Sequence, residues 1–340
     1  MKAKRSLVIF FALLSLPATR LYGQTTASST SSSPKPAASV AGSVPTSSRL
    51  ASPVAPTTAS SIPELKARAD SGDPAARHEL AIFLVSADPS VPGFDQALTW
   101  LQSLAAKNVP DAQFLLGYFY EHAKGLPRDL AKALENYSAA ASQGYPPAEN
   151  NLGALYHYGS GVPQDLALAF RWYRAAALHG NAAGQLNLGT FYYLGYATPV
   201  DYAEATKWFR AAAEQGLALA QDSLAYCYLK GVGVPADYAQ AAHWARLAAD
   251  QGNPRAFALL GYLYETGKGL PLDYVSAYAW YSRAVAAGNA STSDRLKSLS
   301  QIMTQRQIDQ ADSLVSARPI PARHSSDLSA SSPNSLFPNP

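Results

Sequence analysis

Cysteine is almost absent from this sequence. The one cysteine, Cys227, can form no disulfide within the chain, and its place beside Tyr228 predicts a free, buried thiol. The motifs of common enzyme classes are missing too: a G-x-S-x-G turn, a glycine-rich phosphate loop with lysine, and an H-E-x-x-H pair. The six histidines show no spacing typical of metal ligands. We therefore predict no catalytic residues, no metal site and no cofactor.

A hydrophobic run long enough to span a membrane is also lacking near the start of the chain. The apolar run at residues 7–18 has twelve residues, too few for a helix to cross a bilayer, and it follows a basic start. This pattern is typical of a secretory signal peptide, which we place at residues 1–23. No cysteine follows the run, which excludes a bacterial lipid anchor on cysteine. We expect export from a bacterial cytoplasm to the periplasm or beyond, with no stable membrane anchor after cleavage.

The chain lacks an excess of basic charge once this segment is removed. The formal net charge of +3 includes four basic residues within residues 1–23, so a chain that starts at Gln24 has a net charge near −1. Residues 62–317 hold 19 Lys or Arg against 23 Asp or Glu. Binding to nucleic acid needs a clustered basic surface, so we predict no nucleic-acid partner.

Two segments have too few apolar residues to form a core. Between Gln24 and Ser61, thirty of 38 residues are Ser, Thr, Ala or Pro, which predicts a disordered spacer at residues 24–60. Residues 318–340 are rich in Pro and Ser and are predicted to be a disordered tail. The spacer is interpreted either as a passive linker or as a stalk that is glycosylated or crosses a cell wall.

What the chain does contain is an internal repeat. The segment 144–179 recurs in variant form from Gly180, Gly216 and Gly252, each start 36 residues after the last. Four tryptophans and three series of five residues keep the same step: Trp172, Trp208, Trp244 and Trp280; Tyr120, Tyr156, Tyr192, Tyr228 and Tyr264; Pro127, Pro163, Pro199, Pro235 and Pro271; Asp129, Asp165, Asp201, Asp237 and Asp273. A period of this size predicts a stacked array of helix pairs.

One repeat contains the signals for two helices. Ala148, Leu152 and Tyr156 form one stripe of a first helix, which we expect to end at Gly159 in the left-handed conformation. Asp165 is placed to cap a second helix, whose apolar face includes Trp172. The repeated aromatic residues could form a stacking platform for a ligand, but a bulky ring beside small residues is far more typical of a core.

These motifs resemble a known family. The spacing L-G-x-x-Y at Leu152, Gly153 and Tyr156, and the turn GSGVPQD at residues 159–165, are similar to the Sel-one-like repeat (SLR), a branch of the tetratricopeptide superfamily. The resemblance implies an all-α fold, a right-handed α/α solenoid or superhelix. A secreted branch of this family has a cysteine pair in each repeat and has been linked to penicillin binding and β-lactamase activity. This chain lacks the pairs, which argues against that activity.

The boundaries of the array follow from the period. We place the solenoid at residues 61–317, with six repeats starting near residues 72, 108, 144, 180, 216 and 252. Ser61 and Glu64 form a capping box that opens a half repeat, and the first full repeat diverges at residues 86–95. Helices at residues 289–317 are predicted to cap the C-terminal end, the last opened by Thr304 and Gln307.

The resemblance also implies where a partner would bind. In the tetratricopeptide superfamily the first helix of each pair lines the concave surface, and its positions outside the packing stripe lie at steps 6, 7, 10, 13 and 14 from each repeat start. The alternative interpretation of these residues is a solvated helix face. The partner-binding candidates are His78, Glu79, Tyr118, Glu121, His122, Asn150, Asn151, His157, Tyr158, Asn187, Tyr193, Asp222, Ser223, Tyr226, Lys230, Tyr262 and Glu265.

The leading hypothesis from the sequence is an exported, non-enzymatic scaffold that binds a protein or peptide on its concave face. A second hypothesis is a protein that binds or regulates peptidoglycan or other cell-wall material, which export and the spacer would suit equally well. A hydrolase of the β-lactamase type is the third.

Overall fold

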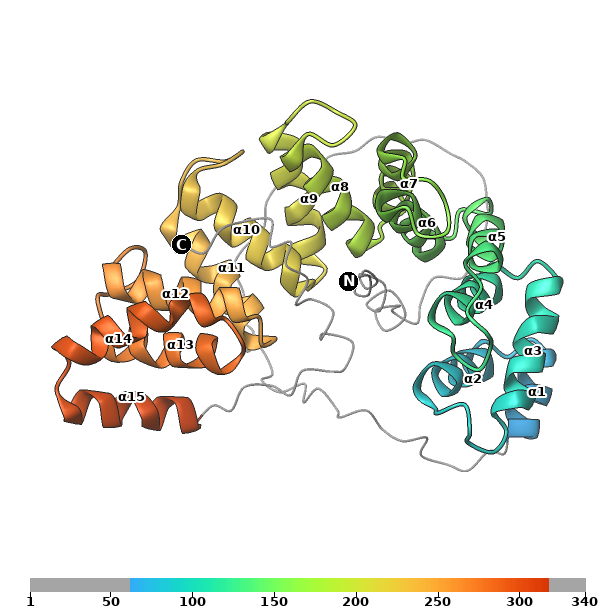
Figure 1. Cartoon of the computed structure of the whole chain (residues 1–340), viewed down its shortest axis with the longest axis horizontal. Coiled ribbons are helices and arrows are strands. Elements are labelled where there is room, and N and C mark those ends of the chain that lie inside the picture. Colours follow the sequence, from blue (N-terminus) through green and yellow to red (C-terminus); the bar gives the residue numbers. More distant parts are fainter. Residues whose placement is uncertain (1–61, 318–340) are drawn as a thin grey trace, which may run out of the picture. The chain divides into compact units, whose positions relative to one another are not determined.

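The computed structural model describes residues 62–317, which form helices and turns without a strand (Figure 1). They belong to two compact units, residues 62–86 and residues 87–317. The first unit consists of α1 (Ile62–Asp70) and α2 (Pro74–Ser86), which pack on each other. Helix α1 confirms the helix predicted for the half repeat. The predicted signal peptide, spacer, tail and N-terminal cap Ser61 lie outside the described residues.

The second unit contains α3, the helices of five repeats and the helices at the C-terminal end of the array. In chain order these helices are α3 (Phe94–Ala106), α4 (Pro110–His122), α5 (Leu130–Ala141), α6 (Pro146–Tyr158), α7 (Leu166–Leu178), α8 (Ala182–Leu194), α9 (Tyr202–Glu214), α10 (Ala218–Lys230), α11 (Tyr238–Asp250), α12 (Pro254–Thr266), α13 (Tyr274–Ala286), the short 3-10 helix η2 (Ala290–Thr292), α14 (Ser293–Ile302) and α15 (Gln305–Ala317).

Each helix from α3 to α13 packs against the next helix along the chain. The first helix of a repeat, such as α6, packs against its second helix, α7, and α7 packs in turn against α8 of the following repeat. Helix pairs stacked in this order at a fixed period define a repeat solenoid. The all-α solenoid predicted from the sequence is therefore confirmed.

The helix ends form as the repeated turn residues predict. Gly159 ends α6 at φ 66, in the left-handed region that favours glycine, and its N–H donates to Leu155 O. Asp165 caps α7, since its Oδ1 accepts a hydrogen bond of 2.9 Å from Leu168 N. The corresponding residue at the end of α4 is Ala123, which adopts the same left-handed conformation at φ 56. Repeated turn chemistry therefore sets the helix lengths.

The largest fully buried side chains are not the repeated tryptophans. Trp172, Trp208 and Trp280 are half-buried, whereas the residue after each of them is fully buried: Tyr173, Phe209 and Tyr281. Tyr137 takes this place in the repeat without tryptophan, and the repeated tyrosines at step 12, such as Tyr156, are also half-buried. The prediction that the repeated tryptophans fill the core was therefore wrong by one residue at Trp172, Trp208 and Trp280.

A helical glycine makes room for each of these buried rings. The ring of Tyr173 lies against Gly153, where an added Cβ would come within 2.7 Å of Tyr173 Cδ1. Gly117 with Tyr137, Gly189 with Phe209 and Gly261 with Tyr281 repeat the arrangement, with closest approaches of 2.8, 2.7 and 2.6 Å. The tryptophan one residue earlier points about 100° away around the helix, toward a less enclosed region. The ring and the glycine form one packing unit per repeat.

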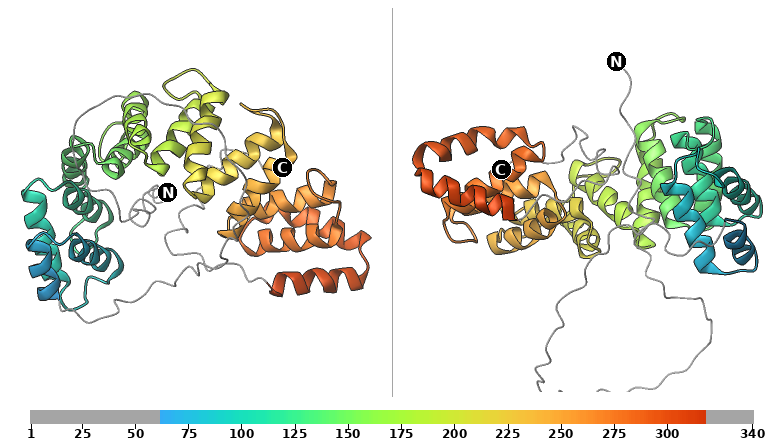
Figure 2. Two further views of the ribbon diagram at one scale, coloured as in Figure 1. Left: turned by 180° about the vertical axis from the view of Figure 1, so that it is seen from behind. Right: turned by 90° about the horizontal axis from the view of Figure 1, so that it is seen from below.

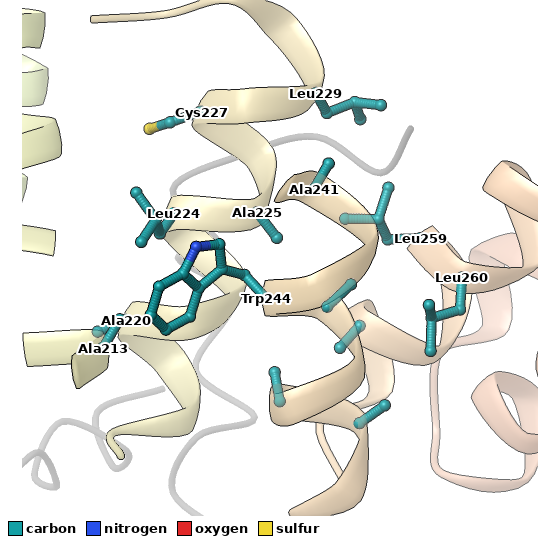
Figure 3. Close-up of a cluster of buried hydrophobic side chains, with 14 of the residues drawn as sticks. Ala213, Ala220, Leu224, Ala225, Cys227, Leu229, Ala241, Trp244, Leu259 and Leu260 are labelled. Atoms are coloured by element: carbon teal, nitrogen blue, oxygen red, sulfur yellow. The ribbon is translucent and has the colours of Figure 1, made fainter. Parts of the chain in front are cut away.

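One repeat departs from this pairing. On α10 and α11 the glycine is replaced by Ala225 and the ring by Ala245, both fully buried. Trp244 is more buried in this repeat, at 9% exposed, and lies against α10 near Leu224 (Figure 3). In this repeat alanine therefore stands at both positions of the pair, with one methyl group more than the glycine and no aromatic ring.

A buried glutamine at step 5 connects a first helix both to the preceding repeat and to the end of its own repeat. Gln185 Nε2 donates to Ala177 O at 3.3 Å, and Gln185 Oε1 accepts a hydrogen bond of 2.7 Å from Gln215 Nε2. The pairs Gln143–Gln113 and Gln251–Gln221 repeat the second bond at 2.8 and 2.9 Å. In one repeat a different pair takes this place, with His179 Nδ1 2.8 Å from Oε2 of the buried Glu149. Sequence analysis missed this ladder, although Gln113, Gln185 and Gln221 keep the repeat register.

The C-terminal end is covered by two helices outside the repeats. Both α14 and α15 pack against α13 (Figure 2). Thr304 N donates to Gln307 Oε1 at 2.9 Å, which confirms the reverse bond of the predicted capping box. The buried Arg283 ties α15 to α13, because its Nη2 donates to Leu314 O at 2.9 Å. Within residues 62–317, no helix is both long and apolar enough to cross a membrane.

Candidate partner-binding surface

The first helices of the repeats carry the candidate surface. Steps 7, 10 and 14 from a repeat start fall on one side of a helix, since they are three, four and seven residues apart. We call the side of α4, α6, α8, α10 and α12 that carries these steps the first-helix face. The carboxyl ends of these helices are its most exposed part, for example Tyr158 on α6 and Lys230 on α10.

Six of the seventeen candidate residues are buried, contrary to the expectation that they lie outside the packing stripe. They are Tyr118, Glu121, Asn150, Asn151, Asp222 and Ser223. The physical reason is that a first helix is enclosed by its own second helix, by the second helix of the preceding repeat and, for α6 and α8, by a neighbouring first helix. Buried positions therefore cover most of the circumference of a first helix. These six side chains lie in the packed layer beneath the exposed residues of the first-helix face.

The other candidates reach solvent in part or in full. His122, His157, Asn187, Tyr193, Tyr226, Tyr262 and Glu265 are half-buried, and Tyr158 and Lys230 are exposed. Glu79 is exposed on α2, in the other compact unit, and the side chain of His78 lies outside the described part of the structure.

A polar network runs beneath the surface from α4 to α8. The buried Tyr137 donates to Glu121 Oε2 at 2.8 Å, and its pKa is well above 10 because of burial, with the charge of Glu121 adding to it. The Asn151 amide lies close enough to the Tyr137 hydroxyl to lower that pKa slightly, although its Nδ2 makes no hydrogen bond of normal geometry within residues 62–317. Asn150 Oδ1 then accepts a 2.9 Å hydrogen bond from Asn187 Nδ2. The candidates at these steps hold neighbouring repeats in register.

Stacked rings occupy the surface on α4 and α6. His122 stacks on Tyr118 with ring centres 4.1 Å apart, and His157 stacks on Tyr158 at 4.4 Å. Burial lowers the pKa of His157, which favours the neutral ring. Burial, with a smaller contribution from the charge of Glu121, raises the pKa of Tyr118 to about 12. This end of the first-helix face is therefore aromatic, and Tyr118 carries no charge near neutral pH.

Tyrosines and cations occupy the surface on α10 and α12. Lys230 Nζ lies 5.8 Å from the centre of the Tyr226 ring, and Lys268 Nζ donates to Tyr262 Oη at 3.1 Å. Arg255 reaches from α12 to the buried Asp222 on α10, with Nε 3.5 Å from Oδ2. Burial raises the pKa of Asp222, and the charge of Arg255 opposes that rise. The first helices of these two repeats are thus connected by an ion pair.

Sequence analysis missed three residues of this region. Arg255 lies at step 3, Lys268 lies in the turn after α12, and Arg295 lies on α14, outside the repeats. Arg295 Nη1 donates to Glu265 Oε2 at 2.9 Å, and its guanidinium carbon is 5.5 Å from the Tyr262 ring centre. Lys268 shares its step with Lys124, whereas Arg255 has no lysine or arginine at the same step of another repeat. Residues 62–317 contain no group of three or more His, Cys, Asp or Glu side chains placed to hold a metal ion.

The fold and this face define a helical-repeat scaffold. The family model for the Sel1 repeat matches five successive segments, residues 110–145, 146–181, 182–217, 218–253 and 254–289. The chain therefore belongs to the Sel1 repeat family, as the turn and spacing motifs predicted. The divergent repeat that starts at Gly72 is not among the matched segments.

Solved structures show the same fold. The chain is similar to c5321, described as a protective antigen of uropathogenic Escherichia coli with an SLR fold, at 32% identity and a TM-score of 0.64, over 74% of this chain and 54% of that one. It thus spans about half the length of that protein. A Sel1 repeat protein from Oxalobacter formigenes is similar at 29% identity and a TM-score of 0.57, over 70% of this chain and all of that one. Comparison with curated proteins gave no significant match.

Proposed function

We propose that this protein is an exported, non-enzymatic scaffold and that it binds a protein or peptide on the concave side of its repeat array, along the first-helix face. The observation that carries the proposal is the contrast between steps on the same helices. The packing stripe that contains Ala148 and Leu152 repeats small and apolar residues, whereas the accessible step 14 changes from His122 to Tyr158 to Lys230. A packing position has reason to stay constant, and a recognition position has reason to vary.

The residue types at the accessible steps support binding to protein. Tyrosine is enriched in protein interfaces because its ring gives a large contact area and its hydroxyl can form a hydrogen bond. Tyr158, Tyr193, Tyr226 and Tyr262 present such rings from four successive first helices. The helices beneath are fixed by hydrogen-bonded pairs such as Asn150–Asn187, so binding would order few additional groups.

Crosslinking tests the proposed surface. A photoreactive benzoylphenylalanine in place of Tyr158 should capture a partner in the native bacterium, because it would lie on the first-helix face. The matched control is the same residue in place of Leu178, which is 59% exposed on the second helix of the same repeat. Crosslinks from position 158 that are absent from position 178 would support the proposal. Equal crosslinking, or crosslinking from position 178 alone, would place the partner elsewhere.

Export has its own test. Residues 1–30, fused to a phosphatase that is active only outside the cytoplasm, should give phosphatase activity, because they contain the basic start and the apolar run. A fusion in which the apolar run carries two added Asp residues should give none. Recovery of the protein from the cytoplasm with residues 1–23 still attached would contradict export.

A further inference from the structure

Two similar groups of side chains lie one repeat apart, each around a tyrosine of the first-helix face. In the first, Lys230 Nζ is 5.8 Å from the centre of the Tyr226 ring. In the second, Lys268 Nζ is 5.5 Å from the centre of the Tyr262 ring and donates to its hydroxyl at 3.1 Å. Tyr226 and Tyr262 are both at step 10, on α10 and α12. We call these two groups the tyrosine–lysine sites.

Each site also contains an arginine whose charge is already paired. Arg255 beside Tyr226 pairs with Asp222, and Arg295 beside Tyr262 pairs with Glu265. Within residues 62–317, neither Lys230 nor Lys268 forms an ion pair with a carboxylate. Each site therefore contains one acid, two bases and a net positive charge.

This positive charge is local. On α4, α6 and α8, no lysine or arginine lies at steps 10 and 14. Lys124 lies at the step of Lys268 in the repeat of α4, but burial lowers its pKa, and the charge of Asp88 is close enough to oppose that lowering. The array as a whole has more acidic than basic residues over residues 62–317. A region of opposite sign on a face suited to protein binding selects a partner by charge complementarity.

We propose that the tyrosine–lysine sites bind an extended acidic segment of a partner protein, with one carboxylate at Lys230, another at Lys268, and the intervening chain against the rings of Tyr226 and Tyr262. The inference rests on the proposed function and specifies the chemistry of the ligand. The ion pair of Arg255 with Asp222 joins α12 to α10, so one extended chain can reach both sites. A polyproline II chain rises about 9 Å per turn of three residues, so acidic residues at every third position present carboxylates at multiples of that spacing.

An acidic peptide suits these sites better than a nucleic acid. A phosphate backbone needs a run of unpaired cations, since its binding depends on releasing many counterions. Two of the four cations, Arg255 and Arg295, are already paired with carboxylates that would repel phosphates. Two lysines with apolar ring surface beside them match a few carboxylates on an extended chain.

The test uses the full chain and a fluorescein-labelled peptide of repeated Glu-Ala-Pro, followed by fluorescence anisotropy. This peptide places one carboxylate on each polyproline II turn, and repeated Gln-Ala-Pro is its neutral control. The glutamate peptide should bind at low salt, more weakly as salt is added, and at least about tenfold more tightly than the glutamine peptide. The double variant Lys230→Gln/Lys268→Gln should lose about tenfold in affinity, as expected for two partly exposed ion pairs.

The matched control is Lys132→Gln/Lys207→Gln, which makes the same change in net charge on the second helices α5 and α9. It should change the affinity less than about twofold. Absence of binding by the glutamate peptide, equal binding of the two peptides, equal effects of the two double variants, or tighter binding of single-stranded oligothymidylate would overturn the inference. The crosslink from position 158 would persist in those cases if the proposed function holds, and would be lost if that function fails as well.

Discussion

Replacing Phe209 with alanine should lower the free energy of unfolding by about 3–5 kcal/mol, the typical cost of removing a fully buried aromatic ring. Replacing Trp208, its neighbour in sequence, should cost roughly half as much, because that ring is half-buried. Urea denaturation followed by circular dichroism measures both values. A larger loss for Trp208 than for Phe209 would contradict the observed packing.

The position of the loss along the chain is a second readout of the same variant. Each repeat contacts only its neighbours in a solenoid, so stability is nearly local. Hydrogen exchange in Phe209→Ala should rise most within residues 180–252, and amides of α4 and α5 should change little. A uniform rise across the array would argue against stacked, nearest-neighbour packing.

The sequence predicted the order and ends of the helices because local chemistry determines both. Left-handed glycines such as Gly159 and capping aspartates such as Asp165 act within a few residues, and both recur with the period. The end predicted for the first helix at Gly159 and the cap predicted for the second helix at Asp165 are both confirmed.

The sequence did not predict which of two adjacent aromatic residues fills the core. Trp172 keeps the period most strictly, yet Tyr173 is the buried ring. The choice depends on which side of α7 faces Gly153 on α6, a matter of helix rotation that periodicity does not report. The informative signal was the correlated change at Ala225 and Ala245, where both partners of the pair depart from the pattern together.

The sequence predicted the candidate surface only in part, because it does not report contacts between helix pairs. Tyr158, Tyr226 and Lys230, at steps 10 and 14, reach solvent as expected, whereas Tyr118 at step 10 is buried. Steps 6 and 7 were not predicted correctly, because Asn150 and Asn151 are buried by contacts between repeats. Arg255 and Arg295 are brought to this surface by the stacking of α10, α12 and α14, which the sequence does not show. Contacts within a helix pair follow from the sequence period, while contacts between pairs need the structure.

Gly189→Ala should destabilise the protein even though alanine is the better helix former. The added Cβ would lie 2.7 Å from Phe209 Cδ1 and 3.0 Å from Ala205 O, and neither atom belongs to a flexible side-chain end. Overpacking of this kind costs about 1–3 kcal/mol. The gain from replacing a helical glycine is about 1 kcal/mol. We expect the clash to exceed the gain, with a net loss measured by urea denaturation.

The same change should be neutral or stabilising when Phe209 is alanine. Without the ring, the helix-propensity gain remains and the main clash is gone, so a double-mutant cycle of Gly189→Ala and Phe209→Ala should give a coupling of about 1–3 kcal/mol. The repeat with Ala225 and Ala245 already contains this combination, which shows that a Cβ fits beside the backbone at this step. Ala225→Gly is the matched control: it relieves no clash, so it should cost about 0.5–1 kcal/mol. Additive effects of the two changes would mean that the glycine and the ring are not one packing unit, and that the simultaneous change at Ala225 and Ala245 has another cause.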